Sequence, residues 1–178
     1  MSSFMKEDAM IPAGLLESRL PLPVETHGLG HFSRYDPIPH VHVTVEAPDC
    51  MPRRHTAGAA GFDLVAKEAA SIPARGSTVV DTGVSVSLPP GHYARIAGRS
   101  SLAFKHGVTA FEGTVDQDYR GPIKVKLFNH SDKEFSIAEK QRIAQMIIHT
   151  YVAPHMNVVS HLSQTGRGAG GFGSTGSM

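Results

Sequence analysis

Apolar and polar residues alternate along three stretches of the chain, and this alternation predicts β-strands. It covers residues 41–46, 84–89 and 123–128, where valine, isoleucine or leucine fills every second position. A strand with one buried face needs this pattern because successive side chains point to opposite faces. Turn-forming sequences such as Pro89-Pro90-Gly91 and Asn129-His130-Ser131-Asp132 separate the stretches. Many short strands with frequent turns favour an all-β sandwich or barrel.

The sequence pattern divides the chain into three parts. Residues 1–39 contain several prolines and glycines without a sustained period, and we expect an irregular N-terminal extension. Residues 40–160 form the expected β-domain. Within it the segment from Ser100 to Gly107 begins with a capping serine and ends with glycine, which predicts about two helical turns. Residues 161–178 form a glycine-rich C-terminal arm that cannot pack a core by itself.

Composition narrows the class of protein. The chain has 178 residues, a formal net charge of +1 and a single cysteine, Cys50. We therefore expect no general attraction to nucleic acid or membrane, and no internal disulfide. Acidic residues stand near the start, where a signal peptide would be basic, and no apolar run approaches the ~20 residues that span a bilayer. A soluble intracellular protein follows as the expectation. His40 and His42 would share one strand face, but the sequence has no second spaced pair, so a structural zinc site is not expected.

Two segments are suited to binding anions. In Gly98-Arg99-Ser100-Ser101-Leu102, an arginine and two hydroxyls stand where the helix begins; the alternative is plain helix capping. In the arm, Arg167 precedes Gly168-Ala-Gly-Gly-Phe-Gly-Ser-Thr-Gly176, where glycines let backbone N–H groups approach a phosphate. The alternative for the arm is a disordered linker tail.

Three further segments carry polar groups between or within strands. Gly113-Thr-Val-Asp-Gln-Asp-Tyr-Arg-Gly121 places Asp116 and Asp118 on one face of an expected hairpin, where a carboxylate can accept a proton from an attacking water. The alternative is a solvated hairpin rim. Gln145 stands beside an apolar run, and read alone it belongs to an ordinary core strand with one exposed amide. Asp63 could stand near a cation or an arginine, but a turn followed by a strand explains it as well.

Taken in order, these five segments resemble the five motifs of the trimeric dUTPase family. The resemblance runs from about Val41 to Gly176, and its third and fifth motifs are long and specific. The matching segments are Ala60-Gly-Phe-Asp-Leu-Val-Ala66, Gly98-Arg-Ser-Ser-Leu-Ala103, Gly113-Thr-Val-Asp-Gln-Asp-Tyr-Arg-Gly121, Arg142-Ile-Ala-Gln-Met-Ile147 and Arg167-Gly-Ala-Gly-Gly-Phe-Gly-Ser-Thr-Gly176.

The resemblance implies a fold, a reaction and an assembly. The fold would be a jelly-roll-like distorted β-barrel, the dUTPase-like β-clip, with one short helix. The reaction would be hydrolysis of dUTP to dUMP and pyrophosphate with Mg²⁺, which keeps uracil out of DNA and supplies dUMP for thymidylate synthesis. The assembly would be a homotrimer in which three chains share each active site. A protein partner for residues 1–39 is a further possibility.

The same resemblance implies roles for individual residues. Asp116 would activate the attacking water, and Tyr119 would lie under the deoxyribose and exclude a 2′-hydroxyl. Uracil would be read by the backbone of Gly113, Thr114 and Val115, with Lys124 contributing from the return strand. Asp63 would reach magnesium through water. The remaining substrate-binding positions are phosphate contacts at Arg99, Ser100, Ser101 and Gln145, and arm contacts at Arg167, Phe172, Gly173, Ser174 and Thr175, with Phe172 over the uracil.

The sequence also departs from the family pattern and leaves two other functions open. Phe62 stands where tyrosine is frequent, and Gly98 and Ser101 stand where proline and glycine are common, which puts the phosphate geometry in doubt. One alternative is a dUTPase-fold module used for protein contacts, and the other is a related dCTP deaminase. Asp116 and Tyr119, together with the glycine-rich arm, favour dUTP hydrolysis.

Overall fold

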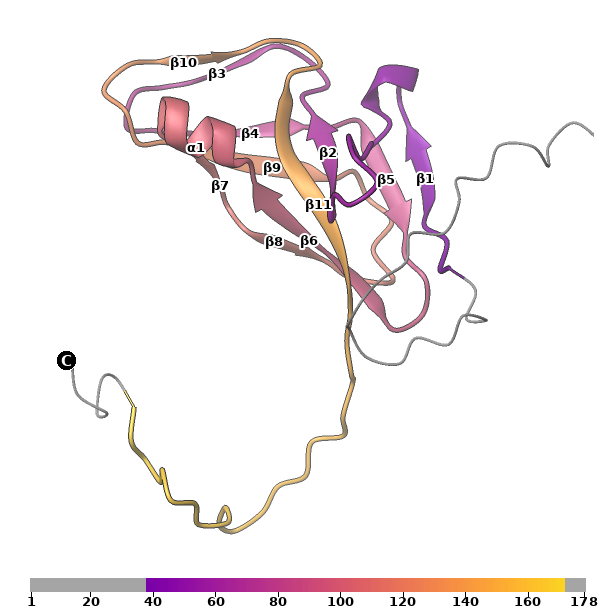
Figure 1. Ribbon diagram of the computed structural model, residues 1–178, viewed down its shortest axis with the longest axis vertical. Helices are drawn as coiled ribbons and strands as arrows, with labels where there is room; N and C mark the ends of the chain where they lie inside the picture. The colour runs from indigo at the N-terminus through magenta and orange to yellow at the C-terminus, as the bar shows by residue number, and fades with distance from the viewer. Residues whose placement is uncertain (1–37, 172–178) are drawn as a thin grey trace, which may run out of the picture. The chain divides into compact units, whose positions relative to one another are not determined.

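The fold is built almost entirely from short antiparallel strands (Figure 1). The computed structural model describes residues 38–171. Most of the expected N-terminal extension and the last part of the arm, including Phe172, Gly173, Ser174 and Thr175, lie outside this range. The predicted division of the chain into three parts therefore stays a prediction.

Eleven strands and one α-helix occupy the described residues. They run in the order β1 (His42–Val45), a 3₁₀ turn (Pro48–Cys50), β2 (Gly61–Val65), β3 (Ala70–Ile72), β4 (Ser77–Asp81), β5 (Val84–Ser87), β6 (His92–Gly98), α1 (Ser100–His106), β7 (Val108–Ala110), β8 (Gly113–Val115), β9 (Lys124–Asn129), β10 (Phe135–Ile137) and β11 (Arg142–Thr150).

These strands form four antiparallel sheets. The largest has the order β2-β11-β6-β8, a second has the order β4-β9-β7, and β1-β5 and β3-β10 are pairs. The predicted all-β fold with one short helix is confirmed. Within residues 38–171, however, the hydrogen-bonded sheets do not join into a closed barrel.

Alternation in the sequence corresponds to alternation in burial. In β9 and the residue before it, Ile123, Val125 and Leu127 are buried while Lys124 and Lys126 are exposed. In β5, Val84 and Val86 are buried and the serines beside them are half-buried, so the strands predicted in 84–89 and 123–128 are confirmed. In β1 the valines are half-buried and their polar neighbours exposed. In β5 and β9 the core is filled from one strand face, as expected for sheets that bury one side, whereas β6 and β11 also bury neighbouring residues.

The helix begins differently from the expectation. Its N-cap residue is Arg99, in extended conformation and without a side-chain capping bond, so the predicted serine cap is wrong. Ser100 is instead the first helical residue, because β6 continues to Gly98 and leaves one residue for the change of direction. The predicted end is confirmed, since Gly107 has a φ of 65° and its N–H bonds the carbonyls of Ala103 and Leu102. At seven residues, α1 is far too short to cross a bilayer, and no other helix of residues 38–171 qualifies.

Candidate functional site

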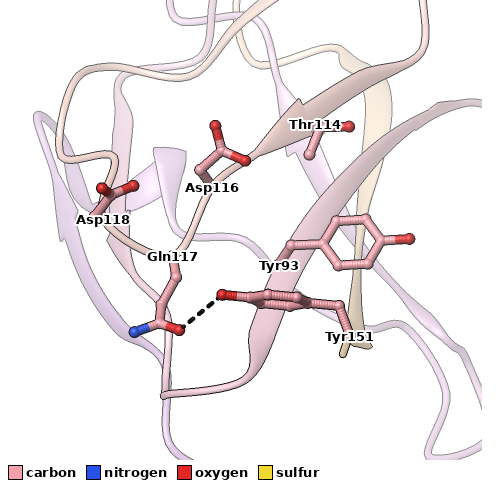
Figure 2. Close-up of a pocket in the computed structure, with 6 residues that line it drawn as sticks. All are labelled: Tyr93, Thr114, Asp116, Gln117, Asp118 and Tyr151. Carbon is pink, nitrogen blue, oxygen red and sulfur yellow. Dashed lines mark hydrogen bonds between the residues drawn. The ribbon is translucent and has the colours of Figure 1, made fainter. Parts of the chain in front are cut away.

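One cavity collects the carboxylates that follow β8 (Figure 2). Its volume is about 610 Å³, and we call it the carboxylate pocket. Thr114 comes from β8, Tyr93 from β6, and Tyr151 directly follows β11. The lining residues are Tyr93, Thr114, Asp116, Gln117, Asp118 and Tyr151.

Strand alternation directs Asp116 into this pocket. Val115 is buried in the core, whereas Thr114 and Asp116 on either side of it are exposed. Asp116 then opens a turn in which its carbonyl accepts a hydrogen bond from the Tyr119 N–H at 3.2 Å. Asp116 and Asp118 make no ion pair with any residue of 38–171, so both carboxylates stay available to solvent or a ligand. The prediction that they share one face is consistent with their lining one cavity.

The loop that carries them is not the expected simple hairpin. β8 pairs with β6, whereas β9 pairs with β4 and β7, so the two flanking strands belong to different sheets. The returning chain is diverted because the Ile123 N–H bonds the carbonyl of Val84 and its own carbonyl accepts from Thr82. Lys124 consequently begins β9 as an exposed side chain and does not line the carboxylate pocket.

Tyr119 is held against the backbone of this loop. Its hydroxyl donates to the carbonyl of Pro122 at 3.1 Å. A Cβ at position 121 would lie 2.5 Å from that hydroxyl oxygen and 2.7 Å from the ring carbon bearing it, so a side chain there would displace the Tyr119 ring. The ring remains 44% exposed and does not line the carboxylate pocket. It therefore offers a fixed, accessible aromatic edge beside the aspartates.

In the part of the chain that the structure describes, a second cavity is lined mainly by basic side chains and by no carboxylate. Its volume is about 420 Å³, and we call it the cationic pocket. One wall is a face of α1, where Ser101 and Lys105 stand four residues apart and so lie on the same side of the helix. The other wall is the turn that leads into β11. The lining residues are Arg99, Ser101, Leu102, Lys105, His106, Lys140, Gln141 and Arg142.

The carboxylate of Asp63 accepts hydrogen bonds from two of the arginines that line this pocket. Its Oδ1 accepts from Nε of Arg99 at 3.2 Å, and its Oδ2 accepts from Nη1 of Arg142 at 3.1 Å. Nε2 of His55 lies 3.1 Å from the same Oδ2. Asp63 is only 16% exposed, so these contacts are partly shielded from water. The carboxylate thereby orients two guanidinium groups that border the pocket.

Lys140 adds a permanent charge to the cationic pocket. Partial burial lowers the pKa of Lys140, but the Glu139 carboxylate and the Cys50 sulfur raise it more, so the net shift is upward. Its Nζ donates to the carbonyl of Lys67 at 3.2 Å. The ammonium therefore stays charged at neutral pH.

Gln145 lies beside this cluster without lining either cavity. It faces Asp63 across the β2–β11 ladder, and its Nε2 donates to the carbonyl of Gly98 at 3.0 Å. A Cβ at Gly61 would collide with its Oε1, so the amide is packed tightly. Ser100 is exposed at the start of α1, next to the pocket residue Ser101.

The arm contributes nothing to either cavity within the described chain. Side chains from 152 to 169 are exposed, and Arg167 bonds the carbonyl of Gly170 within its own turn. The predicted site residues thus divide into two groups on one chain: Thr114 and Asp116 line one cavity, and Arg99 and Ser101 the other.

The residues also permit a test of the magnesium expectation. Magnesium prefers oxygen ligands and keeps several of its waters. Both oxygens of Asp63 already face cations, whereas Asp116 and Asp118 offer free carboxylate oxygens. No group of three or more histidine, cysteine, aspartate or glutamate side chains is arranged for a metal within residues 38–171. The donor set therefore fits an ion held mostly by ligand oxygens and water.

Several residues of the two cavities were not found from the sequence. Tyr93, Gln117 and Tyr151 meet in the carboxylate pocket only through the pairing of β6, β8 and β11. A local signal existed for Lys105, which follows Ser101 at helical spacing. Lys140 and Gln141 carry no such signal, because only the fold brings their turn to α1.

Comparison with known proteins gives three further findings. The sequence model of the dUTPase family matches residues 48–176. The deoxyuridine 5′-triphosphate nucleotidohydrolase of Yarrowia lipolytica is 53% identical over 127 residues, which cover 70% of this chain and 81% of that protein.

Solved structures agree in fold. The dUTPase of Staphylococcus bacteriophage 80alpha with dUpNHpp has a TM-score of 0.72 at 23% identity, covering 78% of this chain and 99% of that one. A variant dUTPase of phage phi11 of S. aureus, described with a structural Mg(II) ion, has a TM-score of 0.65 at 20% identity, covering 68% of this chain and 97% of that one. At such identities the likeness concerns the jelly-roll-like β fold alone.

Proposed function

Since this chain belongs to the dUTPase family, we propose that it hydrolyses dUTP to dUMP and pyrophosphate. The observation that carries the proposal is the position of Asp116, an exposed carboxylate that enters an open cavity directly after a buried strand residue. Asp116 takes a proton from a water molecule as that water attacks the α-phosphorus. The bond between the α-phosphorus and the bridging oxygen breaks, and pyrophosphate leaves. This reaction keeps uracil out of DNA and supplies dUMP for thymidylate synthesis.

The phosphate chain binds at the cationic pocket. Arg99 and Ser101 border this cavity, and Ser100 and Gln145 are their immediate neighbours in the fold. Guanidinium forks match phosphate oxygens, and the Asp63 carboxylate holds Arg99 in one orientation before a ligand arrives. The surrounding basic side chains favour a ligand that carries several negative charges.

The base and sugar bind along β8 and the loop that follows it. The backbone of Gly113, Thr114 and Val115 reads uracil, with Lys124 contributing, and a base with the wrong donor pattern would leave buried polar groups unpaired. Tyr119 lies under the deoxyribose and leaves no room for a 2′-hydroxyl. Its fixation by Pro122 and Gly121 supports this role, because a ring excludes a substituent only when it cannot move aside.

Three copies of the chain share each site. The separation of Asp116 from Arg99 into different cavities supports this arrangement, since one chain alone does not bring both to the same cavity. The exposed arm supports it as well, because it can lie across a neighbour. Arg167, Ser174 and Thr175 then contact the γ-phosphate, Phe172 covers the uracil, and Gly173 is a further substrate-binding position.

Magnesium acts as the cofactor. When bound, it neutralises charge on the phosphates, and it takes most of its ligands from the substrate and water. Asp63 reaches it through water at most, because its two oxygens already hold cations.

A pyrophosphate-release assay tests this function. The chain is assayed with dUTP, dCTP and UTP, each with and without Mg²⁺, and we expect release from dUTP that depends on the metal. Ammonia released from dCTP would identify a deaminase instead. A chain that releases nothing from any nucleotide would be a binding module, and the proposal would be wrong.

A further inference from the structure

Gln117 joins the loop of Asp116 to two other segments of the chain. It is half-buried, although the aspartates on both sides of it are exposed. Its Oε1 accepts a hydrogen bond from the Gly91 N–H at 3.0 Å. The same oxygen accepts a second hydrogen bond, from the Tyr151 hydroxyl, at 3.2 Å (Figure 2). A carbonyl oxygen has two lone pairs, so this one amide oxygen is fully used.

The two donors come from structurally distinct places. Gly91 lies in the turn between β5 and β6 with a φ of 73°, a conformation that favours glycine. Tyr151 is the first residue after β11, where the chain begins its course toward the C-terminal arm. The two are also joined directly, because the Tyr151 N–H donates to the Gly91 carbonyl at 3.0 Å. Gln117, Gly91 and Tyr151 therefore form a closed triangle of three hydrogen bonds.

Aromatic packing restricts the third corner of this triangle. The Tyr151 ring meets the Tyr93 ring edge to face, with centroids 6.3 Å apart. Tyr93 in turn stacks on His149 at 5.2 Å. The Tyr151 hydroxyl is thus presented to Gln117 by rings that belong to neighbouring strands.

We propose that Gln117 is a positioning residue, which fastens the Asp116 turn to the chain at the end of β11 and so sets the carboxylate in its reactive place. The inference rests on the proposed function for its consequence, but the fastening itself is a property of the fold. Asp116 precedes Gln117 directly, so a displacement of the Gln117 amide moves the Asp116 carboxylate. A small misplacement of a reacting group can cost about a hundredfold in rate.

Two variants at this position distinguish the effect of the hydrogen-bond acceptor from that of side-chain size. Gln117→Leu keeps the size of the side chain and removes the acceptor, whereas Gln117→Glu keeps an oxygen at the same reach. Because two hydrogen bonds are lost, we expect Gln117→Leu to lower kcat/KM for dUTP by about tenfold or more, mostly through kcat. Gln117→Glu should recover most of that loss.

Tyr151→Phe removes one of the two donors to Gln117 and completes a double-mutant cycle with Gln117→Leu. It should lower kcat/KM by a smaller factor in the parent and have no further effect in the Gln117→Leu background. Asp132→Ala is the matched control. It removes an exposed hydrogen bond, from Nε of Arg75 at 2.7 Å, that also joins two turns but lines neither cavity. It should change kcat/KM by less than about twofold.

Amide hydrogen exchange at Gly91 provides a readout that does not depend on catalysis. Its N–H loses its acceptor in Gln117→Leu, so exchange there should be faster by about tenfold, and Gln117→Glu should restore protection. Unchanged exchange in Gln117→Leu would overturn the fastening. Faster exchange with parental kcat/KM, or a loss that Gln117→Glu does not repair, would overturn the positioning role. A parent chain that does not hydrolyse dUTP would refute the proposed function, while the exchange data would still decide the fastening.

Discussion

Glycine at position 121 controls where the Tyr119 ring can lie. The space that a side chain would need there is filled by the tyrosine hydroxyl and ring. The Tyr119 ring thus packs directly against the backbone of Gly121, two positions further along the chain. In the proposed function, the selection against ribose depends on this contact.

Gly121→Ala should therefore weaken selection for the sugar. The added methyl group displaces the Tyr119 ring, so kcat/KM for dUTP should fall while the ratio of dUTP to UTP hydrolysis falls about tenfold or more. Gly58→Ala is the matched control, since a Cβ at Gly58 meets nothing within 4 Å. Steady-state kinetics with both nucleotides measure the ratio. Parental selectivity in Gly121→Ala would exclude Tyr119 as the residue that tests the sugar.

Asp116 and Asp118 line the same cavity, but only Asp116 is proposed to act as the general base. Asp116→Asn removes the proton acceptor without changing shape, so kcat for dUTP should fall by about a hundredfold or more. Binding of a non-hydrolysable dUTP analogue, measured by calorimetry, should persist. Asp118→Asn serves as the control in the same turn and should cost much less in kcat. Equal losses in the two variants would mean that the cavity needs negative charge rather than one specific base.

Among the helices and strands, sequence patterns predicted those features that depend only on neighbouring residues. The strand from Val84 and the strand from Lys124 follow from alternation alone, because burial of one face is a property of each strand. The end of α1 follows from Gly107, because a positive φ is a local requirement. The serine cap was wrong because the exit of β6, and not the helix sequence, sets where α1 begins.

Pairing between distant segments could not be predicted in the same way. The expected hairpin after β8 is replaced by bonds from Ile123 to Val84 and Thr82, which lie about forty positions earlier in the chain. Gln117 acquires its partners for the same reason. A pattern in one segment records which face is buried, but it does not record which strand becomes the neighbour. The identity of the site residues beyond single motifs came from resemblance to a family.

The arm is the element whose removal is most informative. A chain that ends at Gly166 should keep its fold, because the side chains from 152 to 169 are exposed and leave the core untouched. Its melting temperature should stay within a few degrees of that of the full chain, as for surface changes worth about 0.5 kcal/mol. Turnover of dUTP should become very slow, because closure over the substrate excludes water. Full turnover in the shortened chain would remove the arm from the mechanism.

At the scale of the whole molecule, the proposed sharing of sites makes a strong prediction. Asp116→Asn chains keep an intact arm, and chains ending at Gly166 keep Asp116. When the two inactive forms are unfolded together and refolded, some mixed assemblies should contain sites with one intact copy of each part. Activity should then reappear in the mixture, and light scattering should give the mass of a trimer. A mixture that stays inactive, or a monomeric mass, would mean that each site belongs to one chain.

The basic lining of the cationic pocket also affects how a ligand arrives. Among residues 38–171, five basic side chains and no carboxylate border that cavity, so its electrostatic field extends into the solvent beyond contact distance. Mobile ions shorten that reach to about 8 Å at physiological ionic strength. The enzyme should therefore capture a triphosphate more slowly as salt is added, while the speed of bond cleavage after capture stays nearly constant. In a cell whose ionic strength changes, the rate of substrate binding would therefore change, whereas the rate of bond cleavage would not.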